Sequence, residues 1–451
     1  MLNKVLKHFQ SNGLKSNLMR SGLTSIAIKV FGLGFSLVTA VILARVLGPE
    51  QYGIYSYVLA IVSILAIPAM FGLPSLIVRE TAKAEVNQEW GVMRGLWSWS
   101  NRITTSSSML IAVIAAVVLW LNRDSFSQIQ FLTFAWGIAF IPLSALAALR
   151  GASLRGLRKV IQGQLPEEVI KPVLFVVILI TVGLLGNTKI TAQSAMMFNA
   201  LSAGLAFIFG AWLLQSVKPE QLSSAIRRFE SKTWFNSMIS FAALSGLAVL
   251  VTQTDIIMLG ILKESTDVGI YKVATQGATL AGLGIVAANM VGMPYMSRFS
   301  SNKDFENLKK ITKNIARASL ILAVVITLIF GIFGESLILL VFGKDYIVAY
   351  IPLFLLAIGQ VLHAGFGPGG TLLNMCGHER GTLITLIISA LINVALNFLF
   401  IPLWGVYGAA LATLISILFR KITIWIMVYF IFGIDSSVLG LKFKREVQLN
   451  Q

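Results

Sequence analysis

The stretch LARVLGPEQYGIY, residues 43–55, decides the fold of this chain. It lies between two apolar runs, residues 24–46 and 54–71. Each run is close to the length of roughly 20 apolar residues that a helix needs to cross a bilayer. Gly48 and Pro49 interrupt the apolar pattern, and both residue types are typical of turns. The stretch therefore predicts a hairpin of two membrane-spanning helices.

The same pattern returns in the second part of the chain. Gly269-Ile270-Tyr271 repeats Gly53-Ile54-Tyr55 at a distance of 216 residues (269 − 53). At that offset the apolar run 241–262 falls on residues 25–46. A match that keeps a helix–turn–helix in register indicates an internal duplication, with the second half beginning near Lys232.

The two halves are expected to run through the membrane in the same direction. Six apolar runs separate the two GIY segments, and an even number preserves direction. The related segments GLRK (156–159) and GHER (377–380) each precede the fifth run of their half. Parallel repeats are typical of transporters that rock two lobes around a central cavity. We expect an all-α polytopic membrane protein of two six-helix lobes around such a cavity.

Composition supports this fold class. The 451-residue chain is 56% hydrophobic and 12% charged, whereas a soluble domain carries about 25% charged residues. The net charge of +17 is spread between apolar runs, which indicates membrane topology and argues against nucleic-acid binding. A single cysteine, Cys376, excludes an intrachain disulfide, and with three histidines no Cys/His metal site is expected.

About twelve apolar runs are long enough to span a bilayer. We expect a basic amphipathic N-terminal segment (1–23), an N-lobe (24–217), a cytoplasmic linker (218–233), a C-lobe (234–431) and a cytoplasmic tail (432–451). The last run contains Arg420-Lys421, so we expect its membrane span to end near Phe419 and the helix to continue along the interface.

Lys and Arg residues are concentrated in alternate connections between the runs. The other connections hold only Arg45, Arg123, Lys189, Lys263, Lys272 and Lys344. Cytoplasmic loops of membrane proteins carry an excess of Lys and Arg. We therefore expect both termini in the cytoplasm, both GIY segments on the outer side, and a multi-pass protein of the cytoplasmic membrane.

Three segments resemble a known family. LARVLGPEQYGIYSYVLAIV with GLPSLIVRETAK, TDIIMLGILKESTDVGIYKVAT, and NMCGHERGTLITLIISALINVALNFLFIPLWGVYGAALATLIS are similar to the polysaccharide transporter family. These are O-antigen-type flippases of the multidrug/oligosaccharidyl-lipid/polysaccharide exporter superfamily. The resemblance implies translocation of a polyprenyl-pyrophosphate-linked oligosaccharide by alternating access, for cell-surface polysaccharides such as O-antigen or exopolysaccharide. It also implies glycosyltransferases and a polysaccharide polymerase as partners.

Cations inside or beside the runs are candidates for binding the pyrophosphate, because Arg and Lys suit phosphate groups. The alternative for each is a side chain that reaches the lipid headgroups without a role in transport. The candidates are Lys29, Arg45, Arg79, Lys272 and Arg420.

Asp255 lies in the middle of the seventh run and is the candidate for binding a coupling cation, Na⁺ or H⁺. The alternatives are a pair with a cationic side chain or a hydrogen bond between helices. Glu167 and Lys171 have i,i+4 spacing at the start of the fifth run, which predicts an ion pair.

Polar side chains within the runs are candidates for binding sugar hydroxyls. Asn393 and Asn397 share a helix face, as do Gln360 and His363. The alternative is hydrogen bonding between helices. The candidates are Gln276, Asn289, Gln360, His363, Asn374 and Asn397, with Asn393 beside the last.

Two other functions stay open from the residues. A cation-coupled multidrug or small-solute antiporter of the same superfamily would share the fold. An integral membrane polymerase or glycosyltransferase is disfavoured, because no loop is large enough to carry a catalytic domain. We expect no enzymatic activity and no cofactor: the chain has no G-x-x-x-x-G-K-[ST] motif for ATP.

Overall fold

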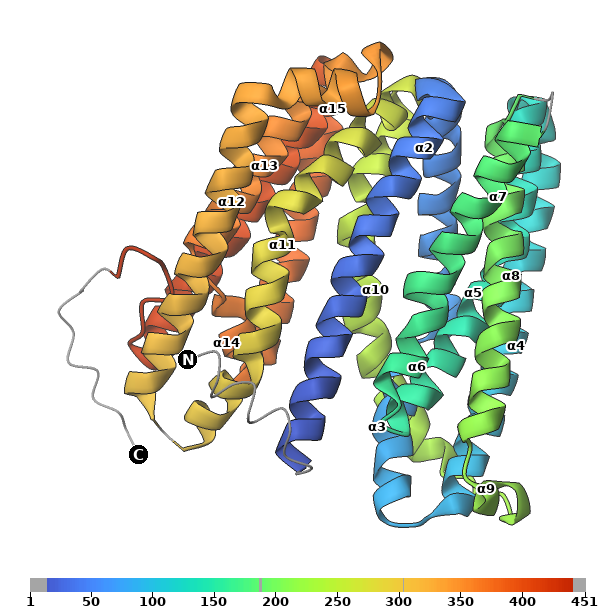
Figure 1. Ribbon diagram of the computed structural model, residues 1–451, viewed down its shortest axis with the longest axis vertical. Helices are drawn as coiled ribbons and strands as arrows, with labels where there is room; N and C mark the ends of the chain where they lie inside the picture. The colour runs from blue at the N-terminus through green and yellow to red at the C-terminus, as the bar shows by residue number, and fades with distance from the viewer. Residues whose placement is uncertain (1–13, 186–188, 303, 441–451) are drawn as a thin grey trace. The chain divides into compact units, whose positions relative to one another are not determined.

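A computed structural model describes residues 14–185, 189–302 and 304–440, which form helices joined by short connections (Figure 1). The first part contains α2 (Leu14–Met70), α3 (Leu73–Val86), α4 (Trp90–Leu121), η1 (Arg123–Ser125), α5 (Gln128–Gly156), α6 (Val160–Leu165), the π-helix η2 (Pro166–Ile170), α7 (Lys171–Leu185), α8 (Ala192–Val217), α9 (Glu220–Ser224) and α10 (Ser231–Leu262). The second part contains α11 (Ser265–Ser301), α12 (Phe305–Val341), η3 (Lys344–Ala349), α13 (Tyr350–Gly365), α14 (Gly369–Met375) and α15 (Glu379–Phe432).

The expectation of about twelve membrane spans agrees with these helices. In the described ranges, nine helices are long and apolar enough to cross a membrane. Two of them are each two helices joined at a glycine with non-helical geometry, Gly48 in α2 (φ 72°) and Gly405 in α15 (φ 54°). Dividing these two and adding α7 gives twelve apolar helical segments among the described residues. The predicted turn at Gly48 is confirmed, because a positive φ favours glycine.

Contacts divide the chain into two compact units. One holds the residues up to Leu47 with Val58–Gln253, and the other holds Gly48–Tyr57 with Thr254–Gln451. In the first unit α5 packs against α3, α4 and α8; in the second α11, α12 and α13 pack against one another and α13 packs against α15. The lobe boundaries predicted from the sequence stay a prediction. Residues 1–13 of the expected N-terminal segment and 441–451 of the expected tail lie outside the described residues.

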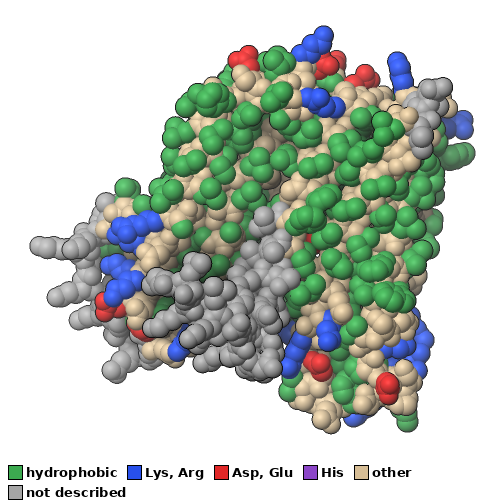
Figure 2. Space-filling model, in the orientation of Figure 1, with side chains coloured by type: hydrophobic (Ala, Val, Ile, Leu, Met, Phe, Trp, Pro, Cys, Tyr) green, Lys and Arg blue, Asp and Glu red, His purple; other side chains and the backbone are tan. Residues whose placement is uncertain are grey.

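Each unit has its own apolar core. In the first, Leu76, Leu96 and Trp234 are buried together. In the second, Met296, Leu372 and Val428 are buried together. The outer surfaces of the long helices are also apolar, as on α4 from Met109 to Leu121. On the face shown in Figure 2, apolar side chains cover the helix surfaces, and Lys and Arg side chains gather near the helix ends. This distribution is what a bilayer requires of spanning helices.

Glycines bring the two copies of the GIY motif together within the second unit. A Cβ atom added to Gly53 would overlap the carbonyl oxygen of Ser265, and one added to Gly269 would overlap that of Pro49. Only glycine permits such close helix contact, which is common in membrane bundles. Tyr52, from the same segment, is buried in this unit. The motif that reveals the duplication therefore forms a close helix–helix contact between its two copies.

The tenth span is broken between α13 and α14. Gly367 lies in the break with φ 74°, and Ser436 and Val438 from the chain after α15 fill it. The Ser436 hydroxyl donates to the carbonyl of Phe366 (3.0 Å), and the Val438 N–H donates to that of Gly365 (3.0 Å). These bonds satisfy carbonyls that the end of α13 leaves without helical partners.

Candidate functional site

The Asp255 carboxylate is the centre of a polar cluster inside the second unit. Its Oδ1 accepts hydrogen bonds from the side-chain amides of Asn397 (2.7 Å) and Asn393 (3.2 Å). Its Oδ2 accepts from the hydroxyls of Tyr271 (2.6 Å) and Thr413 (2.5 Å). All four donors are neutral, so the negative charge of the carboxylate has no cationic partner in this cluster.

Four helical segments supply these residues. Asp255 lies on α10 and Tyr271 on α11, whereas Asn393 and Asn397 precede the bend at Gly405 in α15 and Thr413 follows it. The i,i+4 spacing places the two asparagines on one face, as the sequence predicts. The bend at Gly405 folds the second half of α15 back toward the first.

The oxygen atoms of this cluster are suitable ligands for a small cation. Asn393 and Asn397 are 6% and 0% exposed, and the Asn397 Oδ1 atom is buried without a hydrogen-bond donor. A carboxylate, amide oxygens and hydroxyl oxygens are hard ligands of the kind that bind Na⁺ in transporters, and a carboxylate also accepts H⁺. No described group of His, Cys, Asp and Glu suits a metal that needs several such ligands.

A second cluster in the same unit contains only cationic and basic groups. Lys421 is 6% exposed in the middle of the second half of α15, and Arg420 beside it is half-buried. α15 continues as a helix through both residues to Phe432. The residue at which it leaves the membrane stays a prediction. The charges of Arg420 and Lys421 act on the ring of His363 on α13.

Charged side chains also meet in the first unit. Arg150 on α5 is 6% exposed, pairs with Glu167 of the π-helix η2 at 3.5 Å, and donates to the carbonyl of Phe207. Lys171 instead lies over the ring of Phe140, with its Nζ atom 4.5 Å from the ring centroid. Glu167 therefore pairs with Arg150 instead of with Lys171, the partner that the sequence predicts. The π-helix changes the helical register between Glu167 and Lys171.

The other candidate residues do not gather in either cluster. Arg79 pairs with Glu80 (2.8 Å), donates to Ser237 (2.8 Å) and lies over Phe241, which favours a structural role. Gln360 lies on α13 one turn before His363, and its side chain faces Gly282 on α11. Exposed candidates are Lys29, Arg45 and Asn374, and half-buried ones are Lys272, Gln276 and Asn289.

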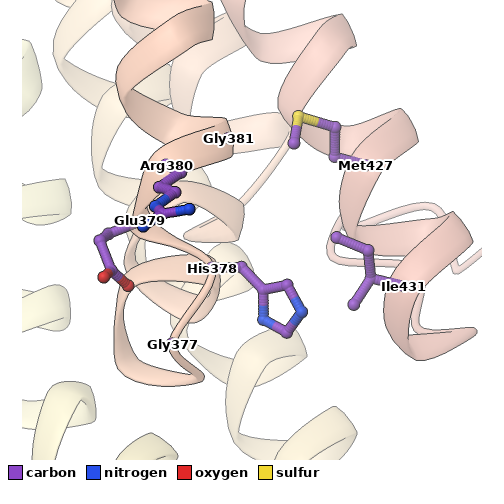
Figure 3. Close-up of a pocket in the computed structure, with 7 residues that line it drawn as sticks. All are labelled: Gly377, His378, Glu379, Arg380, Gly381, Met427 and Ile431. Carbon is purple, nitrogen blue, oxygen red and sulfur yellow. The ribbon is translucent and has the colours of Figure 1, made fainter.

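A pocket of about 430 Å³ opens at the end of the second unit (Figure 3). It lies where the connection before α15 approaches the last turns of the same helix, and its lining includes the GHER segment. The His378 ring packs edge-on against Phe432, with 5.3 Å between ring centroids. The lining residues are Gly377, His378, Glu379, Arg380, Gly381, Met427 and Ile431.

Comparison with known proteins decides the family. The polysaccharide biosynthesis protein family matches residues 18–300, and the MatE family matches residues 240–399. The first match covers more than half of the chain. This chain belongs to the polysaccharide biosynthesis protein family. The resemblance found in the sequence is therefore confirmed.

Among relatives of this family member is the "Probable low-salt glycan biosynthesis flippase Agl15" of Haloferax volcanii. It is 25% identical over 410 residues, which cover 89% of this chain and 81% of that protein. Similar folds include an inward-facing multidrug resistance MATE family transporter (TM-score 0.75, 15% identity, 92% of this chain and 98% of the other). Another is the "Lipid II flippase MurJ, inward closed conformation" (TM-score 0.69, 14% identity), and the match covers 90% of this chain and 87% of the other. The polytopic all-helical membrane fold is therefore confirmed.

Sequence reasoning missed several residues of the two clusters. Tyr271 was visible only as part of the repeated GIY motif, and Thr413 carries no charge that marks it among apolar neighbours. Lys421 was noted in the last run without a role. Outside the two clusters, the buried Arg150 of the first unit was not singled out either. Burial, rather than residue type, distinguishes Tyr271, Lys421 and Arg150, whereas the half-buried Thr413 is marked only by its contact with the carboxylate.

Proposed function

We propose that this membrane protein is a flippase that moves a polyprenyl-pyrophosphate-linked oligosaccharide across the cytoplasmic membrane, with both termini in the cytoplasm. The observation that carries the proposal is the similarity, over 89% of the chain, to a protein named as a glycan biosynthesis flippase. The product serves cell-surface polysaccharide synthesis, beside glycosyltransferases and a polymerase. The chain acts as a transporter and makes or breaks no covalent bond in the cargo.

The physical task matches a protein of two helical units. Sugars and pyrophosphate cannot cross hydrocarbon unaided, because each desolvated polar group costs several kcal/mol. A transporter that alternates between inward-open and outward-open states gives these groups a polar path while the lipid tail stays in the bilayer.

The Asp255 cluster supports coupling of this movement to a cation. A carboxylate held by four neutral donors accepts Na⁺ or H⁺ without displacing a charged protein group. Asp255, Asn393, Asn397 and Thr413 would hold the cation as a co-transported substrate. Because α10, α11 and both halves of α15 meet there, occupancy of the cluster changes how these helices pack.

A cation-coupled multidrug antiporter is the second candidate, favoured by the MatE match over residues 240–399. Proteoliposomes that contain the purified protein separate the two functions. The flippase exposes a fluorescent polyprenyl-pyrophosphate-linked oligosaccharide to a membrane-impermeant quencher faster than protein-free vesicles do. Export of a cationic dye, without movement of the oligosaccharide, would contradict the flippase and support the antiporter.

A further inference from the structure

The cluster of His363, Arg420 and Lys421 gathers three basic side chains in the interior of the second unit, and no carboxylate among the described residues forms an ion pair with them. The ion pairs among the described residues all involve other side chains. Among the unit's acidic side chains, the half-buried Asp255 is bound by the neutral donors described above. Asp435 accepts hydrogen bonds from Trp425 Nε1 and the Ser437 N–H, both at 2.8 Å.

The helix register places the three side chains at one level. Gly359 on α13 faces Leu414 and Ile417 of α15, at 3.5 Å from an added Cβ, and Gly369 on α14 faces Ile424 and Val428. The numbers rise together, so these segments run in the same direction. His363, four residues after Gly359, therefore lies at the level of residues 418–421, beside Arg420 and Lys421.

This arrangement is costly without a ligand. Burying a charge without a partner costs several kcal/mol, and placing a second cation beside it adds repulsion. A structural cation avoids this cost by pairing with a carboxylate, as Arg150 does with Glu167 in the other unit. Arg420 and His363 are half-buried, so an anion can reach the cluster. Arg and Lys together suit a phosphate group, one by its fork of donors and one by its compact charge.

We propose that His363, Arg420 and Lys421 form a binding site for the phosphate groups of a polyprenyl diphosphate. The cluster lies on α15 about 12 Å from Thr413, at 1.5 Å per residue, so it is distinct from the Asp255 cluster. The assignment to a polyprenyl carrier rests on the proposed function. The presence of a phosphate site rests only on the cluster itself.

Binding of farnesyl diphosphate to the purified full-length protein tests this site by isothermal titration calorimetry. Lys421→Met keeps the length of the side chain and removes the charge, and we expect binding roughly 30-fold weaker or more. Lys263→Met is the matched control, because Lys263 donates to the carbonyl of Pro402 and lies outside the cluster. Equal affinity of the wild type and Lys421→Met would overturn the proposal.

Stability without ligand gives a second readout. Lys421→Met is expected to melt at the same or a higher temperature than the wild type, because an apolar side chain replaces an uncompensated buried charge. A large drop in melting temperature would identify Lys421 as a structural residue and overturn the site. Arg420→Gln gives an independent second variant for calorimetry, with the same expected loss of affinity, and equal affinity of this variant and the wild type would also contradict the site.

Competing lipids distinguish the sources of phosphate. Farnesol, which lacks phosphate, is expected not to bind. Phosphatidylglycerol is expected to compete weakly, and competition as strong as that of the diphosphate would assign the cluster to membrane lipid and overturn the proposal. If the wild type binds farnesyl diphosphate but moves no oligosaccharide in proteoliposomes, the proposed function fails while the phosphate site stands.

Discussion

Replacement of Asp255 by Asn tests the cation site through a change that keeps its hydrogen bonds. The Asn oxygen accepts from the amides of Asn393 and Asn397, and its NH₂ group donates to the hydroxyl oxygens of Tyr271 and Thr413. All four contacts survive without the negative charge. We therefore expect Asp255→Asn to change the free energy of unfolding by less than about 1 kcal/mol. Asp255→Ala leaves buried donors unsatisfied and should cost about 3 kcal/mol or more.

The decisive assay is thermal unfolding of the purified protein as the cation is varied at constant ionic strength. A cation at about 100 times its dissociation constant stabilises the folded state by about 2.7 kcal/mol, which raises the melting temperature by a few degrees. The wild type should respond to Na⁺ against choline, and Asp255→Asn should lose that response. Asp124→Asn, which changes a carboxylate that is 93% exposed, is the control. An identical response in the wild type and Asp255→Asn would refute the assignment.

Three further predictions concern packing, charge and pH. Gly53→Ala should lower the melting temperature strongly, because its Cβ overlaps the α11 backbone, whereas Gly34→Ala, with no atom within 4 Å of its Cβ, should raise stability by up to about 1 kcal/mol. Arg150→Met or Glu167→Gln alone should each destabilise the protein by about 3 kcal/mol, and a double-mutant cycle should show recovery when both change. Hydrogen bonds from the Asn307 side chain and backbone lower the pKa of Asp304, so its capping of α12 stabilises at neutral pH. The melting-temperature deficit of Asp304→Ala should therefore shrink as the pH falls below about 4.

The fold could be predicted because its signals are local or repeated. Apolar length gives the spans, Gly48 gives the first bend, and the GIY repeat gives the duplication. Each depends on residue type and spacing, which the bilayer restricts strongly. The contact between Gly53 and the start of α11 was not visible, because packing of two turns depends on the tertiary fold.

The site could be predicted only in part. Asp255 was found because a carboxylate in an apolar run is conspicuous, and Asn397 because polar residues in spans are few. Thr413 and Tyr271 were missed, because hydroxyls are common in membrane helices and only the bend at Gly405 brings Thr413 to the carboxylate. The proximity of His363 to Arg420 and Lys421 depends on the register between α13 and α15, which the sequence does not specify.

The most direct test of the account is the initial rate of oligosaccharide flipping in proteoliposomes under an imposed gradient of Na⁺ or H⁺. A labelled polyprenyl-pyrophosphate-linked oligosaccharide is the cargo, and vesicles without protein give the background. The account predicts that a cation gradient accelerates flipping by the wild type and does not change the rate of Asp255→Asn. Flipping no faster than the background, or the same gradient response in both proteins, would contradict it.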